Sequence, residues 1–213
     1  MSEEQDLSLI VGARVSRLQG EYLRSSAPGA IALLASLRHA VGREPGDVPE
    51  IWEITVAGLG PARGDEPTPR ERACHDAITL YVLHQQSRAT AMHVPGAYLG
   101  RSVHRLGMSG GVDNSRAVRR RFDAAATAST YIELCHHLRG LVSQLRSAAI
   151  PTDYGALARD LLDSQRIGGL AVVRRRWARA YYAEARSAQG ENVTNLGPAS
   201  DVHQDDQASE EEQ

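Results

Sequence analysis

Residues 130–148 read TYIELCHHLRGLVSQLRSA, and this stretch decides the fold class. Its large aliphatic residues recur at helical spacing, at Leu134, Leu138, Leu141 and Leu145. Residues spaced three and four apart share one face of an α-helix. Thr130 followed by Glu133 forms a capping box, which is typical of a helix N-terminus. The stretch therefore predicts one amphipathic helix whose leucine face enters a core.

The same periodicity appears on both sides of this stretch. Further helices are predicted over residues 7–23, 28–40, 49–55, 69–87, 97–106, 114–125, 152–162 and 169–185. No run alternates with a period of two, and no Asn-Gly pair separates strand-like segments. Because every periodic segment has the helical period, the sequence predicts an all-α protein.

The segment from Gly58 to Pro67 is rich in Gly and Pro and is the predicted domain boundary. It separates an N-terminal helical lobe (1–60) from a C-terminal helical bundle (68–186), so the fold should be two-lobed. Residues 187–213 contain no Arg and almost no large apolar residues. Such a segment cannot bury enough surface to offset its ordering entropy. We therefore expect a disordered acidic C-terminal tail.

Composition excludes several classes of protein. The two cysteines, Cys74 and Cys135, are far apart and form no CxxC motif, which excludes a disulfide scaffold and a zinc ribbon. The acidic N-terminus has too short an apolar run for a signal peptide, and no apolar stretch approaches the ~20 residues that span a bilayer. A soluble, cytoplasmic protein without membrane contact is expected. Trp52 and Trp177 are expected in the core rather than as base-stacking platforms.

Charge is distributed very unevenly along the chain. Residues 101–186 contain 15 Arg against 7 Asp or Glu, whereas residues 187–213 carry a charge of −7. A basic block of this kind indicates a polyanion-binding surface. A solvated, salt-bridged helical face is the competing interpretation. All 24 basic residues are Arg, which suits phosphate recognition but also follows from GC-rich coding.

Helical geometry places many of these arginines away from the core faces. In the helix over 169–185, Trp177 and Tyr181 belong to the apolar stripe while Arg175 lies opposite. Applied to all four basic helices, the same construction also places Arg116, Arg146 and Arg186 outward, and the candidates for nucleic-acid binding among the outward residues are Arg101, Arg105, Arg119, Arg120, Arg139, Arg175 and Arg179. If these faces converge in space, they form a groove for a phosphate backbone.

One alternative is enzymatic. His75 and Asp76 are adjacent on a helix and could hold a divalent metal in an all-helical phosphohydrolase. Further ligands would have to come from residues such as His39, Asp153 or Asp160. No GxxxxGK[ST], GxSxG or GxGxxG motif is present. The ligand set is incomplete, so we expect no catalytic residue, no metal and no cofactor, and keep the phosphohydrolase as the alternative.

Several ordered segments resemble one known family. They are PGAYLGRSVHRL, AVRRRF, HHLRGLV, IPTDYGALARDLL and RRRWARAYY, preceded by LASLRHAVGREPGDVPEIWEI. The segments between His93 and Tyr182 resemble the CasB family, the small subunit of the type I-E CRISPR Cascade surveillance complex. The upstream segment resembles the N-terminal part of the same family, so the resemblance covers about residues 28–185. The resemblance implies a non-catalytic, all-helical subunit, usually present as two copies arranged head to tail beside other Cascade subunits.

The resemblance also implies nucleic-acid partners. Family members support the crRNA–target DNA heteroduplex and hold the displaced DNA strand of the R-loop. Their basic positions match Arg38, Arg101, Arg119, Arg120 and Arg139 in this sequence. The family's basic pair is here Arg38-His39, a weaker patch at neutral pH. Arg159 also matches, although Asp160 and Asp163 make a structural ion pair an equal alternative. The acidic tail has no counterpart in the resemblance.

Overall fold

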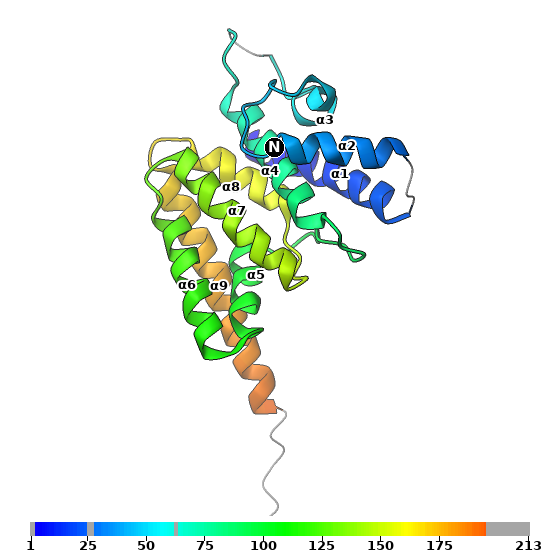
Figure 1. Ribbon diagram of the computed structural model, residues 1–213. Helices are drawn as coiled ribbons and strands as arrows, with labels where there is room; N and C mark the ends of the chain where they lie inside the picture. Colours follow the sequence, from blue (N-terminus) through cyan, green and yellow to red (C-terminus); the bar gives the residue numbers. More distant parts are fainter. Residues whose placement is uncertain (1–2, 25–27, 62–63, 195–213) are drawn as a thin grey trace, which may run out of the picture.

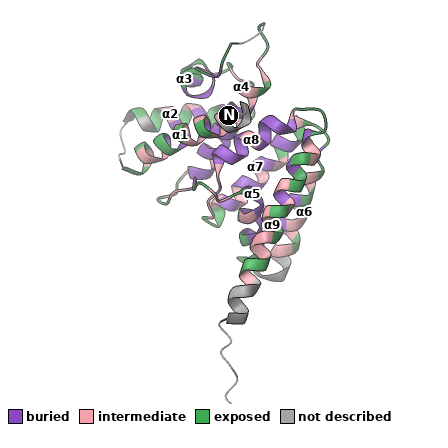
Figure 2. Ribbon diagram, turned by 180° about the vertical axis from the view of Figure 1, so that it is seen from behind, coloured by how far each residue is buried: buried purple, intermediate pink, exposed green. Residues whose placement is uncertain are grey.

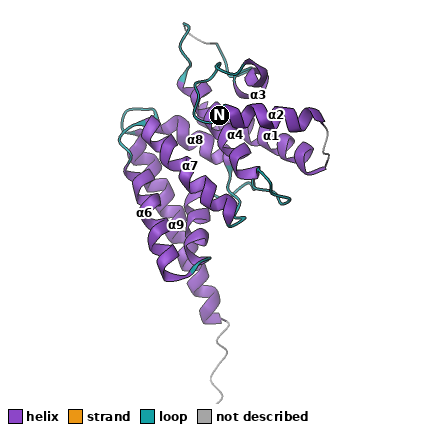
Figure 3. Ribbon diagram, viewed as in Figure 1, coloured by secondary structure: helices purple, strands orange, loops and turns teal. Residues whose placement is uncertain are grey.

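The computed structural model describes residues 3–24, 28–61 and 64–194, and that part of the chain is helical without a β-strand (Figure 3). In chain order the elements are α1 (Glu3–Arg24), α2 (Pro28–His39), a 3₁₀ turn η1 (Pro49–Ile51), α3 (Trp52–Thr55), α4 (Pro69–Gln85), α5 (Leu99–Met108), α6 (Gly111–Thr127), α7 (Tyr131–Ser147), α8 (Tyr154–Ser164) and α9 (Gly169–Thr194). The predicted all-α class is confirmed.

Helices α4 and α8 form the centre of the molecule. Both are buried along most of their length, and the buried residues gather around them (Figure 2). On one side, α1 packs mainly on α8, and α2 and α3 pack beside α4 (Figure 1). On the other side, α5, α6, α7 and α9 form an elongated bundle. None of the described helices is long and apolar enough to cross a bilayer.

The boundary predicted at 58–67 falls in the connection between α3 and α4. Apolar residues from both sides of this connection belong to one continuous hydrophobic cluster. Leu7 and Val11 of α1 are fully buried within it, as is Leu157 of α8. The division into lobes at 1–60 and 68–186 therefore stays a prediction. The disordered tail was expected from residue 187, but residues 187–194 belong to α9, and the remainder of the tail, 195–213, lies outside the described residues.

Two helix crossings require glycine. A Cβ on Gly155 of α8 would lie 2.6 Å from the carbonyl oxygen of Ser8 on α1. A Cβ on Gly100 of α5 would overlap the carbonyl oxygen of Trp177 on α9. Real Cβ atoms cannot approach backbone this closely, so both pairs of helices touch through their main chains.

The sequence signals for helix starts are mostly confirmed. Thr68 and Glu71 form the predicted capping box, with bonds of 3.2 and 2.6 Å. At α7, Thr130 accepts from the Glu133 amide as predicted, but the Glu133 carboxylate accepts from the amide of Ser129 instead. The predicted leucine face of α7 is buried.

Trp52 was expected in the core, and this expectation is wrong. Trp52 is 52% exposed, whereas Ile51 and Ile54 beside it are buried. Helix α3 is a single turn, so burying the two isoleucines places the indole on the opposite, outer face. Trp177 is buried as expected.

Several helix ends differ from the predicted ones. Helix α6 begins at Gly111, before the caps expected at residues 113 or 114, and the Asn114 amide instead donates to the carbonyl of Leu106. Helix α5 begins at Leu99, and α9 continues past Ala185 to Thr194. Helix boundaries depend on local hydrogen bonds that periodicity does not encode.

A polar cluster joins α8 to α9. Asp160 is buried and accepts hydrogen bonds from Arg176 and from Trp177 Nε1, the latter at 2.7 Å. Arg176 also pairs with Asp163 at 2.8 Å. Arg159 lies 3.5 Å from Asp160, which supports the ion-pair alternative for that arginine. The cluster satisfies the indole N–H in the core, where an unpaired donor would be unfavourable.

A second polar cluster joins α4 to α8 through histidine. His84 Nδ1 lies 2.9 Å from the Tyr154 hydroxyl, and the Tyr154 amide donates to His93 Nδ1 at 3.1 Å. Burial lowers the pKa of His84 to about 4 and also lowers that of His93, the latter against the opposing charge of Asp153. Both imidazoles are therefore neutral in the folded protein at neutral pH.

Replacing Asp160 with Ala should lower the free energy of unfolding by about 3 kcal/mol, because it leaves the Trp177 indole without its buried acceptor and removes one of the two carboxylates that hold Arg176. Urea denaturation measures this loss. Asp123→Ala, at an exposed carboxylate on α6, is the control and should change stability little. Equal effects of the two substitutions would contradict the assigned role of Asp160.

Acid should destabilise the protein through His84. The folded-state pKa lies below the ordinary value of 6.5, so the unfolded chain binds the extra proton first. The stability that the neutral His84 contributes is fully present above pH 6.5 and is lost as the pH falls toward 4. The loss is about 1.4 kcal/mol for each unit by which the folded-state pKa lies below the unfolded-state pKa. Denaturation midpoints across this range measure it. His84→Gln should flatten the dependence and the exposed-site variant His136→Gln should not; an unchanged slope in His84→Gln would refute the assignment.

Candidate nucleic-acid interface

Arg101 and Arg105 lie one turn apart on α5 and share a single carboxylate. Glu184 of α9 forms an ion pair with Arg101, whose Nε lies 2.9 Å away, and accepts a hydrogen bond from Nε of Arg105 at 2.6 Å. The Glu184 side chain is only 15% exposed, whereas the two arginine side chains are 40% and 54% exposed. A guanidinium held through Nε still has four N–H groups to offer. Arg101, Arg105 and Glu184 together therefore keep a net charge of +1, and the two guanidinium groups still have N–H donors that face solvent.

Arg119 of α6 reaches the same part of α9. Its Nη2 donates to the Tyr182 hydroxyl at 3.2 Å, and its Nε donates to Asp123 at 3.0 Å. The guanidinium carbon lies 5.3 Å from the ring centroid of Tyr181. The hydrogen bonds to Tyr182 and Asp123 raise the pKa of Arg119. We call this set the α9 cluster: Arg101, Arg105, Arg119, Tyr181, Tyr182 and Glu184.

Arg120 points to a different place, a basic groove between α6 and α7. The groove has a volume of about 460 Å³. We call it the α6–α7 groove, and it is lined by Ala117, Arg120, Arg121, Ala124, His136, His137 and Gly140. Arg120 and Arg121 are exposed and make no ion pair with any described residue. The groove thus offers two uncompensated positive charges on a concave surface.

The remaining candidate arginines lie elsewhere. Arg139 of α7 packs against Gly42, where the positive φ of 78° suits glycine, and it lines a small cleft with Asp76 and Cys135. Arg175 and Arg179 are exposed on α9 without a described ion pair. The structure therefore joins Arg101 and Arg105 through Glu184 and places Arg119 against Tyr181 and Tyr182 of the same helix, but it does not show all the outward arginines in one contiguous cluster.

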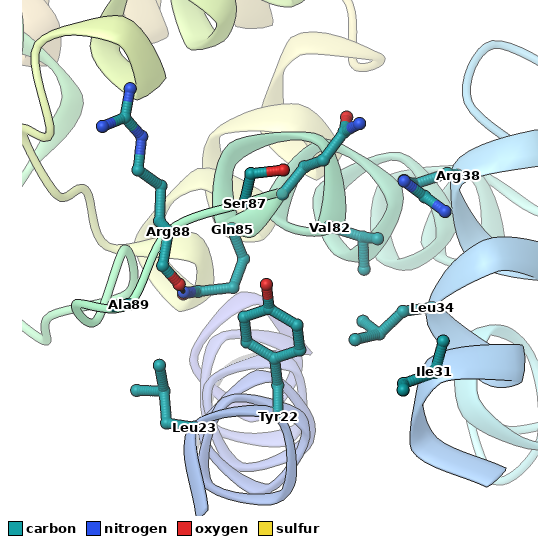
Figure 4. A pocket seen from close by; sticks show the side chains of 11 residues that line it. Tyr22, Leu23, Ile31, Leu34, Arg38, Val82, Gln85, Ser87, Arg88 and Ala89 are labelled. Carbon is teal, nitrogen blue, oxygen red and sulfur yellow. Dashed lines mark hydrogen bonds between the residues drawn. The ribbon is translucent and has the colours of Figure 1, made fainter. Parts of the chain in front are cut away.

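Arg38 borders a groove between α1, α2 and the end of α4. The groove has a volume of about 660 Å³, and Arg38 and Arg88 stand on opposite sides of it with Tyr22 between them (Figure 4). Leu34 and Val82 form part of its apolar lining. Arg38, a basic position that the resemblance implies, is exposed.

The residues nominated for a metal site serve other roles. His75 Nε2 lies 3.3 Å from the carbonyl oxygen of Ala40, whereas Asp76 accepts from the Tyr131 hydroxyl at 2.6 Å. Asp153 caps α8, and Asp160 binds Arg176. Within the described part of the chain, no three His, Cys, Asp or Glu side chains are grouped as metal ligands. The geometry gives the phosphohydrolase alternative no assembled ligand set.

Sequence reasoning missed Glu184 and Arg121. Glu184 is about eighty positions from its partners on α5, and nothing in the spacing of distant helices reveals such a pairing. The signal for Arg121 is the run of three consecutive arginines at 119–121, which places two guanidinium groups side by side on the outer part of the helix.

The comparisons with known proteins agree on one family. A family model described as CRISPR-associated protein Cse2 matches residues 33–182. The crystal structure of CasB from Thermobifida fusca is 34% identical, with a TM-score of 0.69, over 82% of this chain and 97% of that one. A Cse2-family protein from Thermus thermophilus is 24% identical, with a TM-score of 0.61 over 83% and 97%.

A chain from a structure titled CRISPR RNA-guided surveillance complex has the same fold, with a TM-score of 0.68 and 23% identity over 87% of this chain and 99% of that one. A search of curated protein sequences gives no significant match.

Glu184→Gln should raise the affinity for random single-stranded DNA at low salt, because it removes the negative charge that neutralises part of the Arg101–Arg105 pair. Fluorescence anisotropy of a labelled oligonucleotide measures the change. Glu53→Gln, at an exposed acid on α3, is the charge-matched control. A folded Glu184→Gln variant with lower affinity would show instead that the carboxylate serves mainly to orient the two arginines.

Proposed function

The chain belongs to the CRISPR-associated Cse2 family, and from this membership we propose that it is a non-catalytic, nucleic-acid-binding subunit of a cytoplasmic Cascade surveillance complex. Its proposed partners are the other Cascade subunits, a second copy of itself, the crRNA–target DNA heteroduplex and the displaced DNA strand. No membrane contact or cofactor is part of this proposal.

The observation that carries the proposal is the exposure of arginines without compensating carboxylates. Arg120, Arg175 and Arg179 are exposed and have no ion pair among the described residues. A surface whose charges served only solubility would intersperse both signs. Unpaired guanidinium groups instead remain available for phosphate, which they can bind through two parallel hydrogen bonds.

The mechanism follows from the energetics of strand exchange. In RNA-guided recognition, base pairing reads the sequence, and the heteroduplex is about as stable as the DNA duplex that it replaces. Protein contacts to the backbones can therefore tip the balance toward the R-loop. Phosphate contacts suffice for this task, because no base has to be read. Arg38, Arg101, Arg105, Arg119, Arg120, Arg139, Arg175 and Arg179 are the residues proposed to make them.

The two groups of arginines would contribute differently. In the α9 cluster, Tyr182 and Asp123 hold the Arg119 side chain before a strand arrives, so less rotamer entropy is lost on binding. Arg120, Arg175 and Arg179 carry uncompensated charge and strengthen the long-range attraction, which falls as salt rises. Orientation and charge are thus divided between different side chains.

Replacing Arg101, Arg119, Arg120 and Arg139 together with Ala should weaken single-strand binding equally for all sequences and shorten the lifetime of the R-loop in the reconstituted complex. Each lost contact should flatten the plot of log K against log salt by about 0.7 for a single strand. The control is Arg17→Ala, at an exposed arginine of α1. If the fourfold variant folds, assembles and supports R-loops like the wild type, the proposed mechanism fails.

A further inference from the structure

Gly140 has no structural reason to be glycine. It lies inside α7, where glycine is unfavourable compared with alanine. Its φ is not positive, and a Cβ placed on it would meet no atom within 4 Å. Gly100 and Gly155, by contrast, are required by backbone contacts with neighbouring helices. What Gly140 does is keep the floor of the α6–α7 groove open.

The polar side chains around this floor are two arginines, which are cationic, and two histidines, whose rings can donate an N–H group. Arg120 and Arg121 rise from α6, while His136 and His137 rise from α7 with ring centroids 5.6 Å apart. Ala117 and Ala124 complete the shallow lining. None of the described residues that line the groove is Phe, Tyr or Trp, so these residues provide charge and hydrogen-bond donors rather than a stacking platform for bases.

No carboxylate lines the groove, and the nearby acids that the structure describes are held elsewhere. Asp123 of α6 binds Arg119. Glu133 of α7 accepts from the amide of Ser129 at 2.7 Å and lies 3.7 Å from His137 Nε2. Arg120 and Arg121 therefore keep their full charge, and an anion is the complementary ligand.

We propose that the α6–α7 groove binds a phosphodiester group of a nucleic-acid strand, held by Arg120, Arg121 and the adjacent histidines, with Gly140 leaving room for its oxygens. The inference rests on the proposed function and adds to it a defined subsite and three residues, Arg121, His136 and His137. A phosphodiester fits because it carries one negative charge and accepts hydrogen bonds from several directions.

Gly140→Leu tests the proposal without changing any charge. The new side chain would occupy open space in the groove, and leucine favours the helix more than glycine does, so the subunit should stay folded. We expect binding of a labelled oligothymidylate by the full-length protein to weaken roughly fivefold at 0.1 M salt, with the salt slope lower by about 0.7. Arg120→Ala with Arg121→Ala should also lower the slope. Ala13→Leu, at an exposed position of α1, is the control and should bind normally.

The outcomes separate this proposal from the function on which it rests. If Gly140→Leu keeps the wild-type affinity and slope, the groove is not occupied and the subsite is wrong, even if the double arginine variant binds weakly through lost charge. If only Arg101→Ala and Arg119→Ala reduce binding, the subsite is wrong while the proposed function stands. If none of these variants reduces binding, the proposed function fails as well.

Discussion

The C-terminal half of the structure depends on the contacts of one residue, Trp177. Its Nε1 donates to Asp160 of α8, its ring lies 6.1 Å from that of Phe122 on α6, and its carbonyl touches Gly100 of α5. One residue of α9 thus fixes three neighbouring helices. Tyr181 and Glu184 follow one and two turns later on α9. The same anchor therefore sets where α9 contacts Arg119, through Tyr181, and Arg101, through Glu184.

The anchored surface shows two ways in which a helix can carry positive charge. In the α9 cluster, arginine is bound to a carboxylate or a tyrosine, which restricts its rotamers and partly offsets its charge. At the α6–α7 groove, Arg120 and Arg121 are unrestrained and retain their charge. Charge counting along the sequence treats these cases alike, although solvent and salt act on them differently.

The sequence predicted the helical class and most core faces, because apolar periodicity depends on burial within a single helix. Leu134 and Trp177 lie in the core as expected. Trp52 did not follow the prediction, since a one-turn helix has too few positions to define a face. The eight candidate arginines could be assigned to outer faces, but not to common sites. That assignment depends on contacts such as Arg105 with Glu184, which join positions far apart in the chain.

The extension of α9 has a geometric consequence for the charge at the C-terminal end. From Ala185 to Thr194 the helix rises by about 13 Å at 1.5 Å per residue. The screening length in physiological salt is about 8 Å. The last turns of α9 therefore separate Thr194 from the arginines beside Glu184 by more than one screening length along the helix axis.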